Sequence, residues 1–189
     1  MSGIVSLLDP ASERAVRALW AELDERHGLR EVAQRVPYPH CSYHVAEDYD
    51  LAQLAGVLRR VAAQTQPFAA TISGLGAFEQ PEAVLHLAVE RNAALDALHA
   101  ALWRELEQTD IAREPAAIYG AQTWVPHVTL AQRDLTLDAL RAIQAQWAGR
   151  DLRRDIWVSD LTLLHRVSDD ATHTPLLRFS LGSADERHN

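Results

Sequence analysis

Apolar residues recur at helical spacing in four stretches of the chain, and three of these stretches follow a residue that can cap a helix. Asp9 precedes the first stretch, Asp50 the second and Asn92 the third. Asp and Asn side chains accept hydrogen bonds from the free amides of a first helical turn, and the proline after Asp9 fits the first helical position. We therefore predict helices between residues 9 and 28, after residue 50, after residue 92 and at residues 137–147.

Alternation of apolar and polar residues marks strands around these helices, because successive side chains of a strand point to opposite faces. The predicted strands lie at residues 4–8, 38–46, 68–73, 83–90, 122–131, 156–165 and 176–181. Gly74 and Gly76 follow the third of these strands. We predict that they form the turn of a hairpin that joins it to the fourth.

The order of the elements is the same in the two halves of the chain, residues 1–91 and 92–189. Each half reads helix, strand, helix, strand, strand, and we expect the strand at residues 4–8, which has no counterpart, to join one of the sheets. The predicted fold class is α+β, a bilobal duplicated fold with two antiparallel sheets facing across a central cleft and helices outside. We expect one domain made of two pseudo-symmetric lobes, one from each half.

A short motif occurs in one predicted strand of each half. The sequence Pro-His-Cys-Ser at residues 39–42 returns as Pro-His-Val-Thr, with His127 lying 87 positions after His40. On a strand, His40 shares a face with Ser42, and His127 shares a face with Thr129. Two such strands facing each other surround a small space with two imidazoles and two hydroxyls. This set suits an anionic phosphate, since it supplies one base, one acid and two hydrogen-bond donors.

The other histidines carry weaker signals. Alternation places His44 on the same face as His40, and we expect it at the cleft edge or behind the catalytic pair, with a purely structural role equally open. Four residues along a strand span about 13 Å, too far for both rings to bind one ion, so no metal site is predicted. His86 and His165 lack a hydroxyl two positions later, and a structural role is preferred for both.

Composition narrows the classes of function. The 189 residues carry a formal net charge of −8, which argues against an extended nucleic-acid surface but allows a small phosphorylated ligand or the end of an RNA. Cys41 is the only cysteine, which excludes internal disulfides and cysteine-based zinc sites, and alternation directs it into the core. No apolar run is long enough to cross a bilayer, and we expect a cytoplasmic monomer that needs no cofactor.

The two Pro-His-x-Ser/Thr motifs, one in each half of a chain of this size, resemble those of the 2H phosphoesterase superfamily. The closest similarity is to the branch of 2′-5′ RNA ligases and RNA 2′,3′-cyclic phosphodiesterases. The resemblance covers the layout of most of the chain and is specific around residues 38–46 and 124–133. It implies a bilobal fold and metal-independent hydrolysis of a cyclic phosphodiester, and in some members the joining of RNA ends through a 2′-5′ bond.

The resemblance also implies roles for individual residues. His40 and His127 would be the catalytic pair, with His40 as proton donor and His127 as acceptor. Ser42 and Thr129 would contact the phosphate. The motif departs from the family in having serine rather than threonine at position 42, which keeps the hydroxyl.

Residues beside the motifs are further candidates for holding the base or the phosphate. Tyr43 and Arg133 are predicted to bind substrate, whereas Tyr119 and Trp124 are equally open to ordinary packing. The RNA ligase branch tends to carry arginine where this chain has Gln132. That departure weakens the assignment to RNA ends more than it weakens the phosphodiester chemistry.

The expected reaction is hydrolysis of the 2′,3′-cyclic phosphate of a nucleotide or an RNA end. One imidazole takes a proton from the attacking water, and the other protonates the departing ribose oxygen. Two alternatives stay open at the level of the sequence. One is a nucleotide or RNA-end binding protein without turnover, and the other is an interaction domain in which the repeated motif serves packing alone.

Overall fold

The strands of the computed structural model, which describes residues 1–168 and 171–183, form two four-stranded antiparallel sheets. The first sheet has the order β10-β9-β1-β2 and the second the order β7-β5-β4-β8. The first sheet comprises β1 (Ser2–Leu7), β2 (His40–Ala46), β9 (Asp160–His165) and β10 (Thr174–Ser180). The second comprises β4 (Phe68–Phe78), β5 (Val84–Val89), β7 (His127–Gln132) and β8 (Arg154–Val158), while β3 (Asp48–Tyr49) and β6 (Ala112–Arg113) pair separately. The predicted α+β class with two antiparallel sheets is confirmed.

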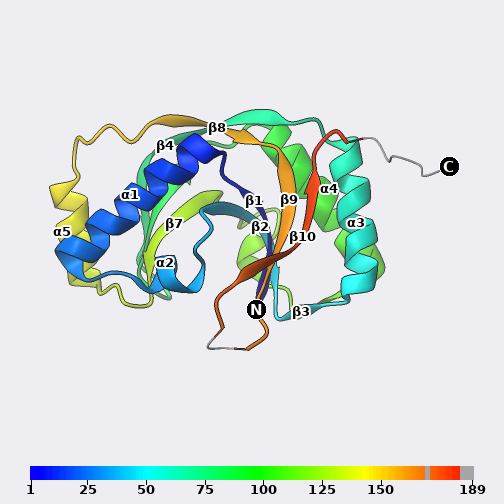
Figure 1. The fold of residues 1–189 in the computed structure, drawn as a ribbon, viewed down its shortest axis with the longest axis horizontal. Helices are drawn as coiled ribbons and strands as arrows, with labels where there is room; N and C mark the ends of the chain where they lie inside the picture. The colour runs from blue at the N-terminus through cyan, green and yellow to red at the C-terminus, as the bar shows by residue number, and fades with distance from the viewer. Residues whose placement is uncertain (169–170, 184–189) are drawn as a thin grey trace.

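Helices flank the sheets at both ends of the molecule. The four long helices are α1 (Pro10–His27), α3 (Leu51–Gln64), α4 (Ala93–Thr109) and α5 (Leu137–Gln146). In Figure 1, α1 and α5 lie at one end, and α3 and α4 lie at the other. Helix α1 contacts β7, α3 contacts β9 and β10, and α4 contacts β2. Two short helical elements were not predicted, α2 (Glu31–Arg35) and a 3₁₀ turn, η1 (Ala117–Tyr119), and neither were the short strands β3 and β6.

The predicted caps fix the ends of the long helices. The Asp9 carboxylate accepts a hydrogen bond from the amide of Ser12 at 3.0 Å, and α1 ends at Gly28 in the left-handed conformation with φ 70°. Asp50 and Asn92 cap α3 and α4 in the same way. These helix starts follow from local chemistry, and their prediction is confirmed.

The predicted hairpin turn at Gly74 and Gly76 is wrong. Strand β4 continues through both glycines to Phe78, and the turn comes after it. Gly76 pairs with His86 on β5, where an added Cβ would lie only 2.3 Å from the imidazole Nε2. The glycine therefore allows the close approach of a buried ring to the strand and does not mark a turn.

The predicted strand at residues 156–165 is two strands that belong to different sheets. Strand β8 ends at Val158 in the second sheet, and β9 begins at Asp160 in the first. Each sheet therefore combines strands from both halves of the chain. The expected lobes at residues 1–91 and 92–189 do not coincide with the two sheets, because the chain crosses between them after β3 and again after β8.

The first strand has a counterpart after all. Strand β1 pairs with β2 just as β5 pairs with β7, both antiparallel. The structural repeat is thus strand, helix, motif strand, helix, seen as β1-α1-β2-α3 and again as β5-α4-β7-α5. Its second copy begins at β5, before residue 91.

Tryptophans hold the two motif strands against the rest of the fold. The indole Nε1 of Trp20 on α1 donates a hydrogen bond to the carbonyl of Thr129, and that of Trp124 donates to the carbonyl of Ser42 at 2.9 Å. Both tryptophans belong to a core of buried side chains that reaches across both sheets. Strands β2 and β7, which come from different sheets, contact each other in this arrangement.

Candidate active site

The structure brings the four motif residues together around two adjoining cavities. His40, Ser42 and Thr129 line one cavity of about 210 Å³, which we call the His40 cavity. His127 lines the other, of about 380 Å³, which we call the His127 cavity. Tyr119 and Gln132 line both. The two histidines and two hydroxyls therefore meet where the motif strands of the two sheets come together.

The two histidines are oriented in the same way. Nδ1 of His40 lies 2.6 Å from the carbonyl oxygen of Tyr38, and Nδ1 of His127 lies 2.7 Å from that of Val125. A carbonyl oxygen can only accept, so Nδ1 donates in both rings. The lone pair of each neutral imidazole is then on Nε2, the nitrogen available to a substrate. Each motif thus fixes the tautomer of its own histidine through the residue two positions before it.

Burial disfavours the protonated form of both imidazoles. It lowers the pKa of His40 from 6.5 to about 4, outweighing the bond to the Tyr38 carbonyl, and the charges of His127 and His173 act in the same direction. Burial also lowers the pKa of His127, against the bond to the Val125 carbonyl. A bound anion stabilises an imidazolium. Binding of a phosphate is therefore expected to raise both pKa values and to favour protonation of one ring.

Hydroxyl groups complete the site. Ser42 and Thr129 both line the His40 cavity, and the side chain of Tyr119 lines it with them. These groups can donate to phosphate oxygens. Tyr119, which the sequence left open between substrate binding and packing, lines both cavities.

A β-bulge moves His44 away from the site. In the pairing of β1 with β2, Ile4 lies opposite His44 and Val5 lies opposite Ser42, so Tyr43 is an extra residue. The bulge reverses the alternation of faces. His44 is only 1% exposed, and its Nδ1 lies 2.6 Å from the Tyr49 hydroxyl. The prediction that His44 shares the face of His40 is therefore wrong.

The same bulge occurs in the second motif. His86 of β5 lies opposite Thr129 and Leu85 lies opposite Ala131, so Leu130 is the extra residue in β7. As a result Gln132 lines the cavities, just as Val45 does in the first motif. In both motifs, the side chain five positions after the histidine therefore lines a cavity of the site.

Of the two other predicted substrate-binding residues, Tyr43 lies elsewhere and Arg133 lines the site. Tyr43 is fully buried on the opposite face of β2, and its hydroxyl donates to Ser6 Oγ at 2.9 Å. The prediction for Tyr43 is wrong because that face packs into the core. Arg133 lines the His40 cavity from the loop after β7, with φ 71°.

Several residues of the site carry no motif in the sequence. Arg35 on α2 lines the His40 cavity, as do Arg166 and His173 in the connection between β9 and β10. Arg166 and His173 are far from both motifs along the chain, whereas Arg35 is on the short helix just before the first motif strand. Only the fold brings the three side chains to one cavity. No pattern in the sequence pointed to them.

A third imidazole lies beside His127. The ring of His86 is centred 5.0 Å from the ring of His127 and stacks on Phe78 at 4.4 Å. His86 is 3% exposed, and its Nδ1 has no hydrogen-bond partner within residues 1–168 and 171–183. Its structural role, preferred from the sequence, is consistent with this burial, but it also forms one wall behind His127.

Within the described part of the chain, no group of three or more histidine, cysteine, aspartate or glutamate side chains is arranged to hold a metal ion. None of its helices is both long and apolar enough to span a membrane.

Both the sequence and the fold of the chain match known proteins. The family model of the 2′-5′ RNA ligase superfamily matches residues 8–170. A Geobacillus kaustophilus protein, GK0864, whose name assigns it provisionally as a phosphoesterase, is 27% identical over 124 residues. This alignment spans 66% of each chain, slightly less than two thirds of the relative's length.

Two solved structures share the fold. TT0787 of Thermus thermophilus superimposes with a TM-score of 0.66 at 18% identity, covering 96% of this chain and 97% of that one. E. coli LigT in complex with NADP⁺ gives a TM-score of 0.59 at 16% identity, with the same coverage. LigT has also been solved with 3′-AMP and with ATP.

Proposed function

Because the chain belongs to the 2′-5′ RNA ligase superfamily of 2H phosphoesterases, we propose that it hydrolyses the 2′,3′-cyclic phosphate of a nucleotide or an RNA end. The observation that carries the proposal is the matched pair of His40 and His127. Each ring donates from Nδ1 to a backbone carbonyl and keeps Nε2 for the reaction. An acid and a base of the same kind, fixed in the same way, suit a reaction that needs one proton removed and one supplied.

In this mechanism the phosphate lies between the two motif strands. One neutral imidazole accepts a proton from water as the water oxygen attacks phosphorus. The other imidazole is protonated and gives its proton to the departing ribose oxygen. The net reaction opens the ring and leaves a phosphomonoester with a free hydroxyl. The negative charge of the phosphate favours the imidazolium that the acid step needs, against the burial that lowers the pKa of both rings.

Hydroxyl donors stabilise the negative charge that develops on the non-bridging phosphate oxygens. Ser42 and Thr129 are the groups we assign to the non-bridging oxygens, and the Tyr119 hydroxyl lies beside them in the lining of the same cavity. The same groups would serve attack by the 5′-hydroxyl of a second RNA instead of water, with a 2′-5′ bond as the product.

The His127 cavity is the proposed site of the nucleobase. Phe78, Trp124 and Val125 give it apolar walls, and the polar groups of Gln80 and Thr123 lie among them. Apolar surfaces with a few polar groups are typical of sites for flat heterocycles. The LigT complexes with 3′-AMP, ATP and NADP⁺ support a nucleotide as the class of ligand.

The direct test is turnover of the four 2′,3′-cyclic nucleoside monophosphates in the presence of EDTA, with the products separated by chromatography. We expect conversion to a nucleoside 2′- or 3′-monophosphate that chelation does not reduce. Loss of turnover on chelation would refute the metal-independent mechanism. Binding of the nucleotides without any product would instead support the non-catalytic nucleotide-binding alternative.

A further inference from the structure

The two cavities at the site differ in charge. Three arginines line the His40 cavity, Arg35, Arg133 and Arg166, together with His173. Among the described residues that line it, Glu31 is the one carboxylate. The described lining of the His127 cavity contains no arginine and includes the carboxylate of Glu82. A further negative group on a substrate is therefore favoured on the His40 side and disfavoured on the other.

The arginine-bearing wall is built from three segments that are tied to each other. The Asp134 carboxylate accepts hydrogen bonds from the amides of Arg30 and Glu31, at 2.7 and 2.9 Å, and so joins the start of α2 to the loop that carries Arg133. At the other end of α2, the Arg35 carbonyl accepts a hydrogen bond from the amide of His173 at 2.8 Å. The positions from which these side chains extend are thus fixed relative to one another.

Arg133 adopts a strained backbone to line this cavity. Its φ of 71° lies in the left-handed region, which costs a residue with a side chain ~1–2 kcal/mol. Such strain gathers at ligand sites, where the surrounding structure imposes it. Within the described part of the chain Arg133 forms no ion pair, and Oδ2 of the neighbouring Asp134 accepts hydrogen bonds from the start of α2 instead.

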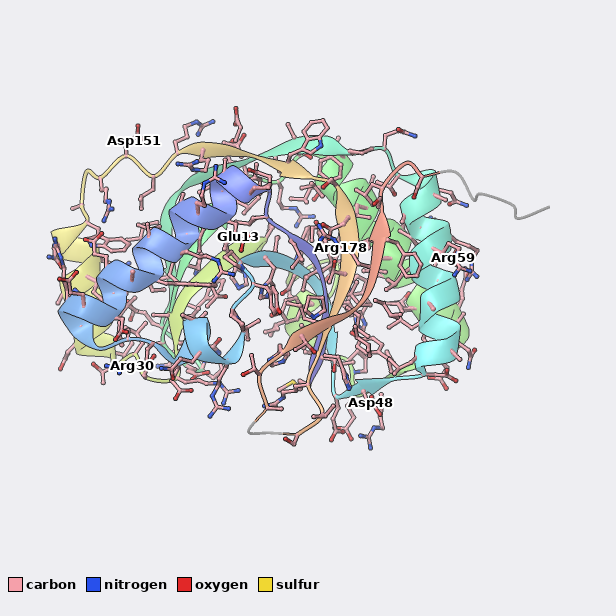
Figure 2. All side chains as sticks on the ribbon, in the orientation of Figure 1. Glu13, Arg30, Asp48, Arg59, Asp151 and Arg178 are labelled. Carbon is pink, nitrogen blue, oxygen red and sulfur yellow. The ribbon has the colours of Figure 1, made fainter. Side chains whose placement is uncertain are left out.

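Arg35 pairs with the Glu31 carboxylate at 2.5 Å, and arginines on the outside of the molecule also pair with carboxylates. Arg178 pairs with Asp160 at 2.9 Å and Arg153 pairs with Glu90 at 2.8 Å. Figure 2 shows acidic and basic side chains spread over several elements, for example Glu13 on α1, Arg59 on α3 and Arg178 on β10. In a chain with a net charge of −8, a cavity lined by three arginines and one carboxylate is therefore a local exception.

Resting on the proposed cyclic phosphodiesterase activity, we propose that the His40 cavity binds a second phosphate of the substrate through Arg35, Arg133 and Arg166. Its volume of about 210 Å³ exceeds several times the ~30 Å³ of a water molecule, enough for a phosphate group. Guanidinium groups match phosphate oxygens with paired hydrogen bonds. The preferred substrate class is therefore a cyclic phosphate that carries another phosphate, either the 5′-phosphate of the same nucleotide or the preceding phosphodiester of an RNA end.

The test compares three substrates that share the same reacting group: adenosine 2′,3′-cyclic phosphate, its 5′-phosphorylated form, and the dinucleotide ApA ending in a 2′,3′-cyclic phosphate. We expect kcat/KM to be at least ~10-fold higher for one of the two substrates with a second phosphate, as expected for one added charge-assisted hydrogen-bonding group. The 5′-phosphorylated nucleotide and the dinucleotide distinguish the two sources of that phosphate. The advantage should shrink at high salt.

Variants assign the effect to the cavity. Arg35→Gln and Arg166→Gln should each reduce the ratio of kcat/KM between the two kinds of substrate several-fold. Arg104→Gln, on the exposed face of α4 and away from both cavities, should keep the wild-type ratio. Because the ratio is measured within one protein sample, partial loss of folding cancels. An unchanged ratio in both cavity variants would overturn the assignment.

Different results would refute the second-phosphate site and the phosphodiesterase activity. Turnover of all three substrates at equal kcat/KM would overturn the second-phosphate site and leave the phosphodiesterase intact. Absence of any turnover would refute the phosphodiesterase, and calorimetric titration would then test the site by itself. Adenosine 3′,5′-bisphosphate binding at least ~10-fold tighter than 3′-AMP, with the difference lost in Arg166→Gln, supports the site, and equal affinities overturn it.

Discussion

Replacing Gly76 with alanine tests how closely His86 packs behind the proposed catalytic His127. The added Cβ would lie 2.3 Å from Nε2 of His86 and 2.9 Å from its Cδ2, whereas heavy atoms in favourable contact are ~3.5–4.0 Å apart. The ring must therefore move by more than about 1 Å. It is confined between Phe78, at 4.4 Å, and the ring of His127, at 5.0 Å.

The magnitude follows from two opposing terms. Overpacking of a buried site costs ~1–3 kcal/mol, while replacing a strand glycine with alanine regains ~0.5–1 kcal/mol of backbone entropy. Because the overlap is as short as 2.3 Å, the cost lies in the upper part of that range, and we expect Gly76→Ala to lower the free energy of unfolding by about 1–2.5 kcal/mol. It should also lower kcat/KM, because a displaced His86 presses on His127.

Urea unfolding and steady-state kinetics with adenosine 2′,3′-cyclic phosphate measure both effects. The matched control is Gly56→Ala on α3, whose Cβ would meet only the flexible Arg60 side chain, at 3.5 Å, and should stabilise the protein by ~0.5–1 kcal/mol. In Gly76→Ala/His86→Ala the space is free again, so the two substitutions should couple favourably. Wild-type stability in Gly76→Ala, or additive effects in the double variant, would refute this packing argument.

Three further predictions concern pH and the corrected residues. Since burial lowers the pKa of both His40 and His127, kcat/KM should peak below pH 6.5, and a maximum above pH 7.5 would contradict the assignment. Burial lowers the pKa of His44 from 6.5 to about 4, so the unfolded chain binds this proton first as the pH falls. Between pH 7 and 5, protonation of this group should lower the free energy of unfolding by up to about 2 kcal/mol. Urea unfolding of His44→Phe over the same pH range should lack this contribution. Tyr43→Phe loses only the hydrogen bond to Ser6, so it should lower the free energy of unfolding by ~1 kcal/mol and keep kcat/KM within about twofold. A tenfold fall in kcat/KM would instead show that Tyr43 takes part in substrate binding.

The parts of the fold that local chemistry determines were predictable from the sequence. Asp9, Asp50 and Asn92 mark helix starts because a capping side chain acts within three residues of itself. The motif strands were predictable because alternation is also local. The partners of those strands were not, and the crossing of the chain between β8 and β9 occurs at a single residue, Ser159, that no pattern marks.

The errors at the site have one physical origin. Strict alternation extends only as far as the next bulge, and both motif strands bulge directly after the hydroxyl residue, at Tyr43 and Leu130. His40 and Ser42 precede the bulge, so their shared face was predicted correctly, whereas His44 follows it and turns into the core. A bulge depends on the pairing with a neighbouring strand, which the sequence of one strand does not contain.

The arginine-lined wall was beyond prediction for a related reason. Arg35 and Arg166 lie in segments without motif or periodicity, and they meet only because Asp134 and His173 tie those segments to α2. The role of Gly76 was unpredictable for the same reason, because it depends on the contact with His86 on the neighbouring strand.

The central claim is most directly tested by the hydrolysis of adenosine 2′,3′-cyclic phosphate in EDTA by the wild type, His40→Ala and His127→Ala. We predict that each variant loses at least ~10²-fold of kcat, the low end for removal of a general acid or base. The double variant should lose little more than either alone, because the two groups act as a unit. Retention of the full rate by either single variant would contradict the account and remove that histidine from the reaction.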